Sequence, residues 1–183
     1  MSVDFATELR SIEHILKGGA TTVKKCQQYE LYAAEGAAPT GRRFDSLEDI
    51  QVFVDQLRDT WWWRSLGYWI VERVEVGKAR NGGRGGSVGW YEKEMNAGRM
   101  EMAPVHWTEL IVLHELSHVL AEALYDSKSH DPAFARTYLQ LVFCVMGDEA
   151  YQALQSSFDR NGIVYDFKTL PESRFALHTT KEN

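Results

Sequence analysis

The sequence has little of what marks a secreted or membrane-bound protein. Only two cysteines, Cys26 and Cys144, occur among its 183 residues. They are too few for a disulfide framework, and they form no C-x-x-C site. No apolar run approaches the roughly 20 residues that span a bilayer, and the chain does not begin with a basic stretch followed by an apolar core. We therefore expect a cytoplasmic protein without membrane contact.

An excess of basic residues is also missing. The 26 acidic residues outnumber the 20 basic ones, which gives a net charge of −6. The only compact basic groups are Lys24-Lys25, Arg42-Arg43 and a loop with Lys78, Arg80 and Arg84. So few charges predict weak, salt-sensitive DNA binding, with dissociation constants no tighter than about 10⁻⁴–10⁻⁶ M. Nucleic acid is therefore not the expected partner.

What the chain does contain is an H-E-x-x-H motif inside an apolar, helix-periodic run. On a helix His114 and His118 lie on one face, about 6 Å apart along the axis. That separation lets two ring nitrogens bind one Zn²⁺ at about 2.0–2.1 Å each. Glu115 then points to the side of the metal, where its carboxylate can take a proton from a water molecule on the ion.

Chance is the alternative explanation of this motif. Shuffling the composition would produce it in roughly 2% of chains, and two histidines can also form a structural pair. Chance matches would mostly fall in polar or loop segments, however, whereas this one lies in an apolar helix. Burying two imidazoles and a carboxylate there is costly unless a partner compensates. A metal ion is such a partner, and we favour the metal site.

A tetrahedral catalytic zinc needs a third protein ligand. Glu122 continues the i+4 series, but it lies about 12 Å along the axis from the first histidine, too far to share one ion. The better candidate is His130, with Asp126 in reserve, because the chain can turn back after the metal-site helix. Asp131-Pro132 is a typical helix start, with an N-cap followed by Pro at the first position. The alternative for His130 is an exposed loop histidine.

These residues together resemble the SprT-like zinc metallopeptidases. The pattern His114-Glu115-x-x-His118 followed by His130-x-Pro132-x-Phe134 is similar to their H-E-x-x-H and H-G-P-x-F motifs. It is closer still to short predicted metallohydrolases of actinobacteria and their phages. The resemblance covers about residues 85–145, and Asp131 stands where the family usually has Gly. The chain has no cysteines for the zinc ribbon that SprT-like proteins often carry.

The resemblance implies a zincin-like α+β fold in which His114, His118 and His130 hold Zn²⁺ and Glu115 is the general base. It also implies that an edge strand beside the cleft pairs with an extended peptide substrate. The sequence allows either 87–92 or 99–103 to be that edge.

Residue patterns predict one domain over residues 1–183: an N-terminal helical part (1–60), a small sheet (68–103), metal-site and C-terminal helices (108–160) and a tail (163–183). Within these parts we expect helices at 4–17, from Ser46 through Leu57, at 132–146 and at 148–160. Strands are expected at 68–76, 87–92 and 99–103, forming an antiparallel meander, with a possible short strand at 29–32. The glycine-rich stretch 81–86 is expected to be a flexible connection.

The expected function is a zinc-dependent hydrolase, in the first place a metallopeptidase acting on protein or peptide substrates. Three alternatives stay open: another zinc hydrolase or a nuclease, a degenerate zincin that only binds a partner, and a structural zinc site, which would need four protein ligands. The group that stabilises the oxyanion is not determined, and His106, Tyr138 and Tyr165 are candidates. The tryptophans at 61–63 are expected to form a hydrophobic plug rather than a partner surface, with at least one of them partly exposed.

Overall fold

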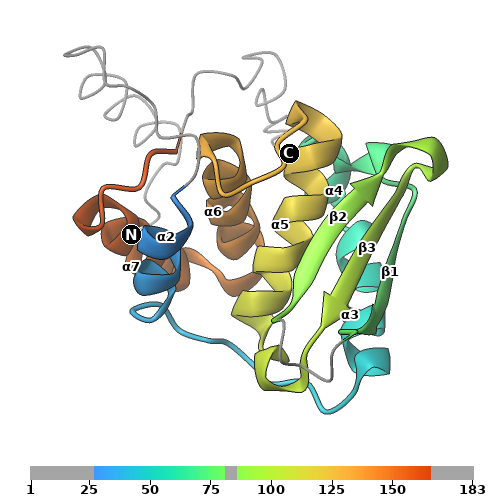
Figure 1. Cartoon of the computed structure of the whole chain (residues 1–183), viewed down its shortest axis with the longest axis horizontal. Helices are drawn as coiled ribbons and strands as arrows, with labels where there is room; N and C mark the ends of the chain where they lie inside the picture. The colour runs from blue at the N-terminus through green and yellow to red at the C-terminus, as the bar shows by residue number, and fades with distance from the viewer. Residues whose placement is uncertain (1–26, 81–85, 166–183) are drawn as a thin grey trace, which may run out of the picture.

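The computed structural model describes residues 27–80 and 86–165 and has an α+β architecture (Figure 1). The predicted helix at 4–17, Cys26 and most of the tail lie outside the described residues. The helices are α2 (Gln28–Glu35), α3 (Leu47–Arg58), α4 (Trp61–Ser65), α5 (Glu109–Tyr125), α6 (Pro132–Met146) and α7 (Asp148–Arg160). The strands are β1 (Arg73–Lys78), β2 (Val88–Glu92) and β3 (Ala97–Met102), and three short 3-10 turns are η1 (Tyr68–Ile70), η2 (Lys93–Met95) and η3 (Pro104–His106).

Helix α5 occupies the centre of the molecule, with the sheet on one side and α6, α7 and α2 on the other (Figure 1). Strands β2 and β3 pack against α5, while α3 covers β1. The apolar residues of α5 are buried almost all round the helix, which explains why its sequence is apolar beyond a single stripe. The protein therefore holds the H-E-x-x-H helix between two layers.

The predicted antiparallel meander is wrong for the first strand. Strand β3 lies in the middle of the sheet, antiparallel to β2 but parallel to β1. A central place suits β3 because its residues Ala97 and Gly98 are small and buried. A Cβ on Gly98 would lie 2.5 Å from Val119 of α5 and 3.1 Å from Val74 of β1. The strand predicted at 68–76 also begins later, at Arg73, because Tyr68–Ile70 forms η1.

The short strand predicted at 29–32 is wrong as well, because this segment belongs to helix α2. Leu31, Ala34 and Glu35 are buried at helical spacing. The tyrosines that suggested a strand are on the surface instead, with Tyr29 86% and Tyr32 48% exposed. Packing against α7 thus outweighs the strand preference of the aromatic residues.

The predicted helix boundaries that depend on local capping are confirmed. The Ser46 hydroxyl accepts a hydrogen bond from the Asp49 N–H, and an Asp131 carboxylate oxygen accepts one from the Phe134 N–H. Helix α5 ends at Tyr125, and the capping residue Asp126 has a left-handed conformation with φ of 54°. Of the adjacent tryptophans, Trp61 is 65% exposed and the next two are buried, as expected.

Side chains from neighbouring helices cover both edges of the sheet. On β1 the Gln51 side-chain amide donates to the Val74 carbonyl at 2.8 Å and accepts from the Val76 N–H at 2.9 Å. On β2 the Tyr91 N–H donates to a Glu122 carboxylate oxygen at 2.9 Å. These three backbone groups are therefore hydrogen-bonded within the protein and are not open for pairing.

Candidate metal centre

Three histidine rings meet between α5 and the start of α6. The Nε2 atom of His130 lies 3.1 Å from Nε2 of His114 and 3.2 Å from Nε2 of His118. One ligand atom from each ring lies within 4.8 Å of the others. Zn–N distances of 2.0–2.1 Å in a tetrahedral site would place two ligand nitrogens about 3.3–3.4 Å apart. The predicted residues are thus brought together at a spacing that fits a metal ion.

Local structure explains how each ring reaches this position. His114 and His118 project from one face of α5, four residues apart. His130 lies just before the Asp131 cap of α6, and its carbonyl accepts a hydrogen bond from the Gln27 N–H at 3.2 Å. The Phe134 ring packs against all three histidine rings, with centroid distances of 4.2–5.0 Å.

The two other carboxylates considered as ligands lie elsewhere. The side chain of Asp126, the reserve candidate, is 90% exposed and lies 3.9 Å from the Lys128 ammonium. Glu122 is bound to the backbone of β2, as described above. Neither residue belongs to the group that can hold a metal.

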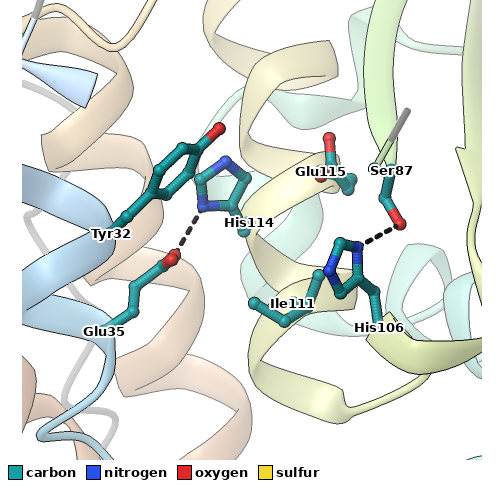
Figure 2. Close-up of a pocket in the computed structure, with 8 residues that line it drawn as sticks. Tyr32, Glu35, Ser87, His106, Ile111, His114 and Glu115 are labelled. Atoms are coloured by element: carbon teal, nitrogen blue, oxygen red, sulfur yellow. Dashed lines mark hydrogen bonds and ion pairs between the residues drawn. The ribbon is translucent and has the colours of Figure 1, made fainter. Parts of the chain in front are cut away.

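Glu35 is a site residue that sequence reasoning missed. Its carboxylate oxygen lies 2.5 Å from Nδ1 of His114, and both side chains are buried (Figure 2). The carboxylate thereby fixes the tautomer with the proton on Nδ1, which leaves the Nε2 lone pair directed at the other two rings. The two residues are 79 positions apart, and no local sequence pattern predicts that α2 contacts His114.

Substituting Glu35 with Gln should weaken metal binding by about 10–100-fold without removing a ligand, because the Glu35 carboxylate orients the His114 ring and raises its basicity. A competition titration with a chromophoric chelator would measure the change. Glu48→Gln, an exposed first-turn glutamate of α3, is the matched control and should bind metal like the wild type. Equal affinity in both variants would contradict the orienting role.

The environment also sets the protonation of the rings in the metal-free protein. Burial, together with the neighbouring His114, lowers the pKa of His118 to about 2 and that of His130 to about 4. Burial alone would lower the pKa of His114 too, but the hydrogen bond and charge of Glu35 outweigh it and the pKa is raised. Two of the three rings are therefore neutral at pH 7, the form that binds metals.

Glu115 lies beside the three histidine rings, and the pKa of its carboxyl group is raised. Burial raises its pKa to about 7, His114 opposes the shift, and the charge of Glu35 adds to it. A hydrogen bond from the Gly89 N–H to the carboxylate lowers the pKa slightly. A carboxyl group with a pKa near the operating pH is well suited to accept and return a proton.

Gly89 brings the edge of β2 into backbone contact with α5. A Cβ at this position would lie 2.1 Å from the Glu115 carbonyl oxygen and 2.9 Å from its carbonyl carbon, distances that real Cβ atoms do not adopt. The absence of a side chain thus allows the strand to approach closely enough for its N–H to reach the Glu115 carboxylate.

Gly89→Ala should push β2 away from α5 and destabilise the protein by about 1–3 kcal/mol, as overpacking of tightly packed sites does. It should also release the Glu115 carboxylate from the strand. Urea denaturation would measure the loss of stability. Gly77→Ala in β1 is the control, because its nearest atom, the Met100 carbonyl oxygen, is 4.0 Å from the added Cβ. A loss no greater than that of the control would refute the close contact.

A cavity of about 440 Å³ opens beside His114 and Glu115. Figure 2 shows Tyr32 and Glu35 of α2 on one side, Ser87 and His106 on the other, and Ile111 between them. Of the three histidine rings, His114 lines this cavity, so the three-histidine group borders the space on one side.

The three candidates for an oxyanion donor lie in different places. His106 lines the cavity. Tyr138 is fully buried, and its hydroxyl donates to the Leu110 carbonyl at 3.3 Å. The Tyr165 hydroxyl donates to Asp159 at the end of α7. Only His106 of the three lines this cavity.

The chain matches no protein-family model, no curated protein and no solved structure. The resemblance to SprT-like metallopeptidases therefore stays a prediction from the motifs. None of the helices in residues 27–80 and 86–165 has the length and apolar character that crossing a membrane requires.

Proposed function

We propose that this protein is a zinc-dependent hydrolase with a zincin-like site, and that it cleaves peptide bonds. The observation that carries the proposal is the convergence of three histidine Nε2 atoms beside a buried carboxyl whose pKa is about 7, next to an open cavity. A structural zinc site would use four protein ligands, whereas three ligands leave a position for water or substrate.

Three imidazoles suit zinc, although they also suit copper, iron and nickel. When bound, such an ion would supply a Lewis acid that acidifies water and polarises a carbonyl oxygen. His114, His118 and His130 would hold it, and Glu35 would keep His114 in the binding tautomer. These assignments use donors whose spacing already fits a tetrahedral site.

In the proposed reaction Glu115 accepts a proton from the attacking water and delivers it to the nitrogen of the leaving amine. In the metal-free protein burial raises the pKa of this carboxyl to about 7, so the group can take either protonation state near neutral pH. The Gly89 N–H holds the carboxylate in place during the exchange. Ile111 gives the cavity an apolar wall against which a substrate side chain can pack.

The charges of the cavity favour a peptide over a nucleic acid. The residues that line it include two acidic side chains, Glu35 and Glu115, and among the described lining residues there is no lysine or arginine. A phosphodiester backbone would be repelled by the carboxylates and would find no cation to neutralise it. A peptide group is neutral and does not face this barrier.

The test compares zinc-loaded wild-type protein with protein stripped by a chelator. Unfolded casein and a quenched fluorescent peptide library are the peptide substrates, while single- and double-stranded DNA and p-nitrophenyl phosphate represent the other hydrolases. We expect zinc-dependent cleavage of the peptides alone. Cleavage of DNA or of the phosphate ester would replace the proposal with the corresponding hydrolase, and zinc binding without any turnover would favour a binding module.

A further inference from the structure

Ser87 and His106 form a hydrogen-bonded pair on the cavity wall across from α2. The Ser87 Oγ lies 3.1 Å from Nδ1 of His106 (Figure 2). Ser87 precedes β2, whereas His106 ends the η3 turn that leads into α5. Neither residue belongs to the three-histidine group, so the pair is a separate feature of the same cavity.

The hydrogen bonds around Ser87 are compatible with a His106 ring that carries its proton on Nε2. The Ala103 N–H already donates to the Ser87 oxygen at 3.0 Å. The hydroxyl keeps its hydrogen, which it can donate to an accepting Nδ1 of His106 at 3.1 Å. A neutral imidazole with an accepting Nδ1 carries its proton on Nε2. Figure 2 shows this second nitrogen on the side of the ring away from Ser87, facing Ile111 and the cavity.

The backbone on both sides of His106 is also fixed. Its N–H donates to the Ala103 carbonyl at 2.9 Å, and its carbonyl accepts from the Thr108 N–H at 2.8 Å. Ala103 itself is fully buried. With the proton on Nε2, the ring presents one N–H donor to the cavity from a hydrogen-bonded turn.

We propose that His106 donates a hydrogen bond from Nε2 to the carbonyl oxygen of the scissile peptide bond, and that Ser87 is the positioning residue that fixes this tautomer. The inference rests on the proposed function. Negative charge grows on that oxygen as water attacks the carbonyl carbon, and a preorganised neutral donor stabilises it. The Nε2 proton stays on the ring throughout, because Glu115 carries the transferred proton.

The test uses His106→Phe, which keeps a ring and removes the donor, and His106→Gln, which keeps a side-chain N–H. Removing one such donor should lower kcat by about 10²–10³-fold, with little change in KM and no change in zinc content. His106→Gln should recover part of the lost kcat. Ser87→Ala should lower kcat less than His106→Phe does, because the donor is still there in part of the molecules. Val105→Ala, a 69%-exposed neighbour, is the matched control.

Two measurements do not depend on turnover. A phosphonamidate peptide imitates the tetrahedral state, so His106→Phe should weaken its binding by the same factor as kcat falls. Nitrogen-15 NMR of the metal-free protein should show the His106 proton on Nε2 in the wild type and a mixture of tautomers in Ser87→Ala.

Each failure has a distinct meaning. A wild-type proton on Nδ1, or unchanged phosphonamidate affinity in His106→Phe, would overturn the role of His106 while the hydrolase proposal stands. A Ser87→Ala loss as large as that of His106→Phe would also overturn it, because it would point to Ser87 itself as the reacting group. Absence of peptide cleavage in the zinc-loaded wild type would overturn the proposed function, and with it the substrate contact.

Discussion

Replacing Glu115 with Gln is expected to leave the metal bound and reduce peptide hydrolysis by at least about 10²–10⁴-fold, the usual contribution of a general base. The amide has the same shape, and its oxygen can still accept from the Gly89 N–H. It cannot take a proton from water, so only the transfer step is lost. Single-turnover assays at equal zinc occupancy would measure the effect.

The same variant should change how stability depends on pH. In the folded metal-free protein the Glu115 pKa is raised from 4.5 to about 7, so ionisation is more costly folded than unfolded. The ionised carboxylate therefore lowers the stability of the fold increasingly from pH 4.5 to about 7, and the full loss is reached above pH 7. Glu115→Gln should therefore be more stable than the wild type at pH 8, by up to about 3 kcal/mol, and similar to it at pH 4.5.

Two results would contradict this role of Glu115. Unchanged turnover in the glutamine variant would exclude it as the base. Loss of zinc would instead make it a ligand, which its position beside the three rings does not suggest. Both outcomes are read from the same purified sample, by activity and by metal analysis.

Replacing His130 with Ala is expected to lower zinc affinity by more than about 100-fold, beyond the loss expected for Glu35→Gln. Purified wild-type protein should carry about one zinc per chain, since the three rings form one site. Two ligands at i and i+4 on α5 would remain, but the third corner of the tetrahedron would be open to water. Elemental analysis and a chelator competition would measure occupancy and affinity.

Asp126→Ala is the matched control for this substitution. It lies four residues before His130 in the same connection, and its side chain is exposed. Its zinc content should equal that of the wild type. Full retention of zinc in His130→Ala, together with a loss in Asp126→Ala, would assign the third ligand to the aspartate instead.

The sequence predicted the parts of the site that local chemistry determines. The H-E-x-x-H spacing depends only on helix geometry, and the Asp131-Pro132 start of α6 depends only on capping. The structure brings His114, His118 and His130 together, as these local features led us to expect. Local rules were sufficient because the three residues lie within 17 positions of one another on two adjoining elements.

The features that sequence reasoning missed depend on contacts between distant segments. Glu35 meets His114 only because α2 packs beside α7, and the α2 sequence shows no strong helical periodicity of its own. The parallel pairing of β1 with β3 likewise follows from tertiary packing, since the small residues Ala97 and Gly98 let β3 fit between its neighbours and α5. Single-sequence patterns carry little information about such contacts.

The covered sheet edges have a consequence for how this protein meets other chains. A fourth strand, whether from a substrate or from a second molecule, would have to displace the Gln51 amide from β1 or the Glu122 carboxylate from β2. The side chains from α3 and α5 thus compete with an added strand for these backbone groups, which protects a small sheet from aggregation. We expect a substrate to be recognised mainly through side chains and the scissile group itself, with little contribution from an extended ladder. Under the proposed function, the side chains on either side of the cleaved bond would therefore decide which sequences are cut.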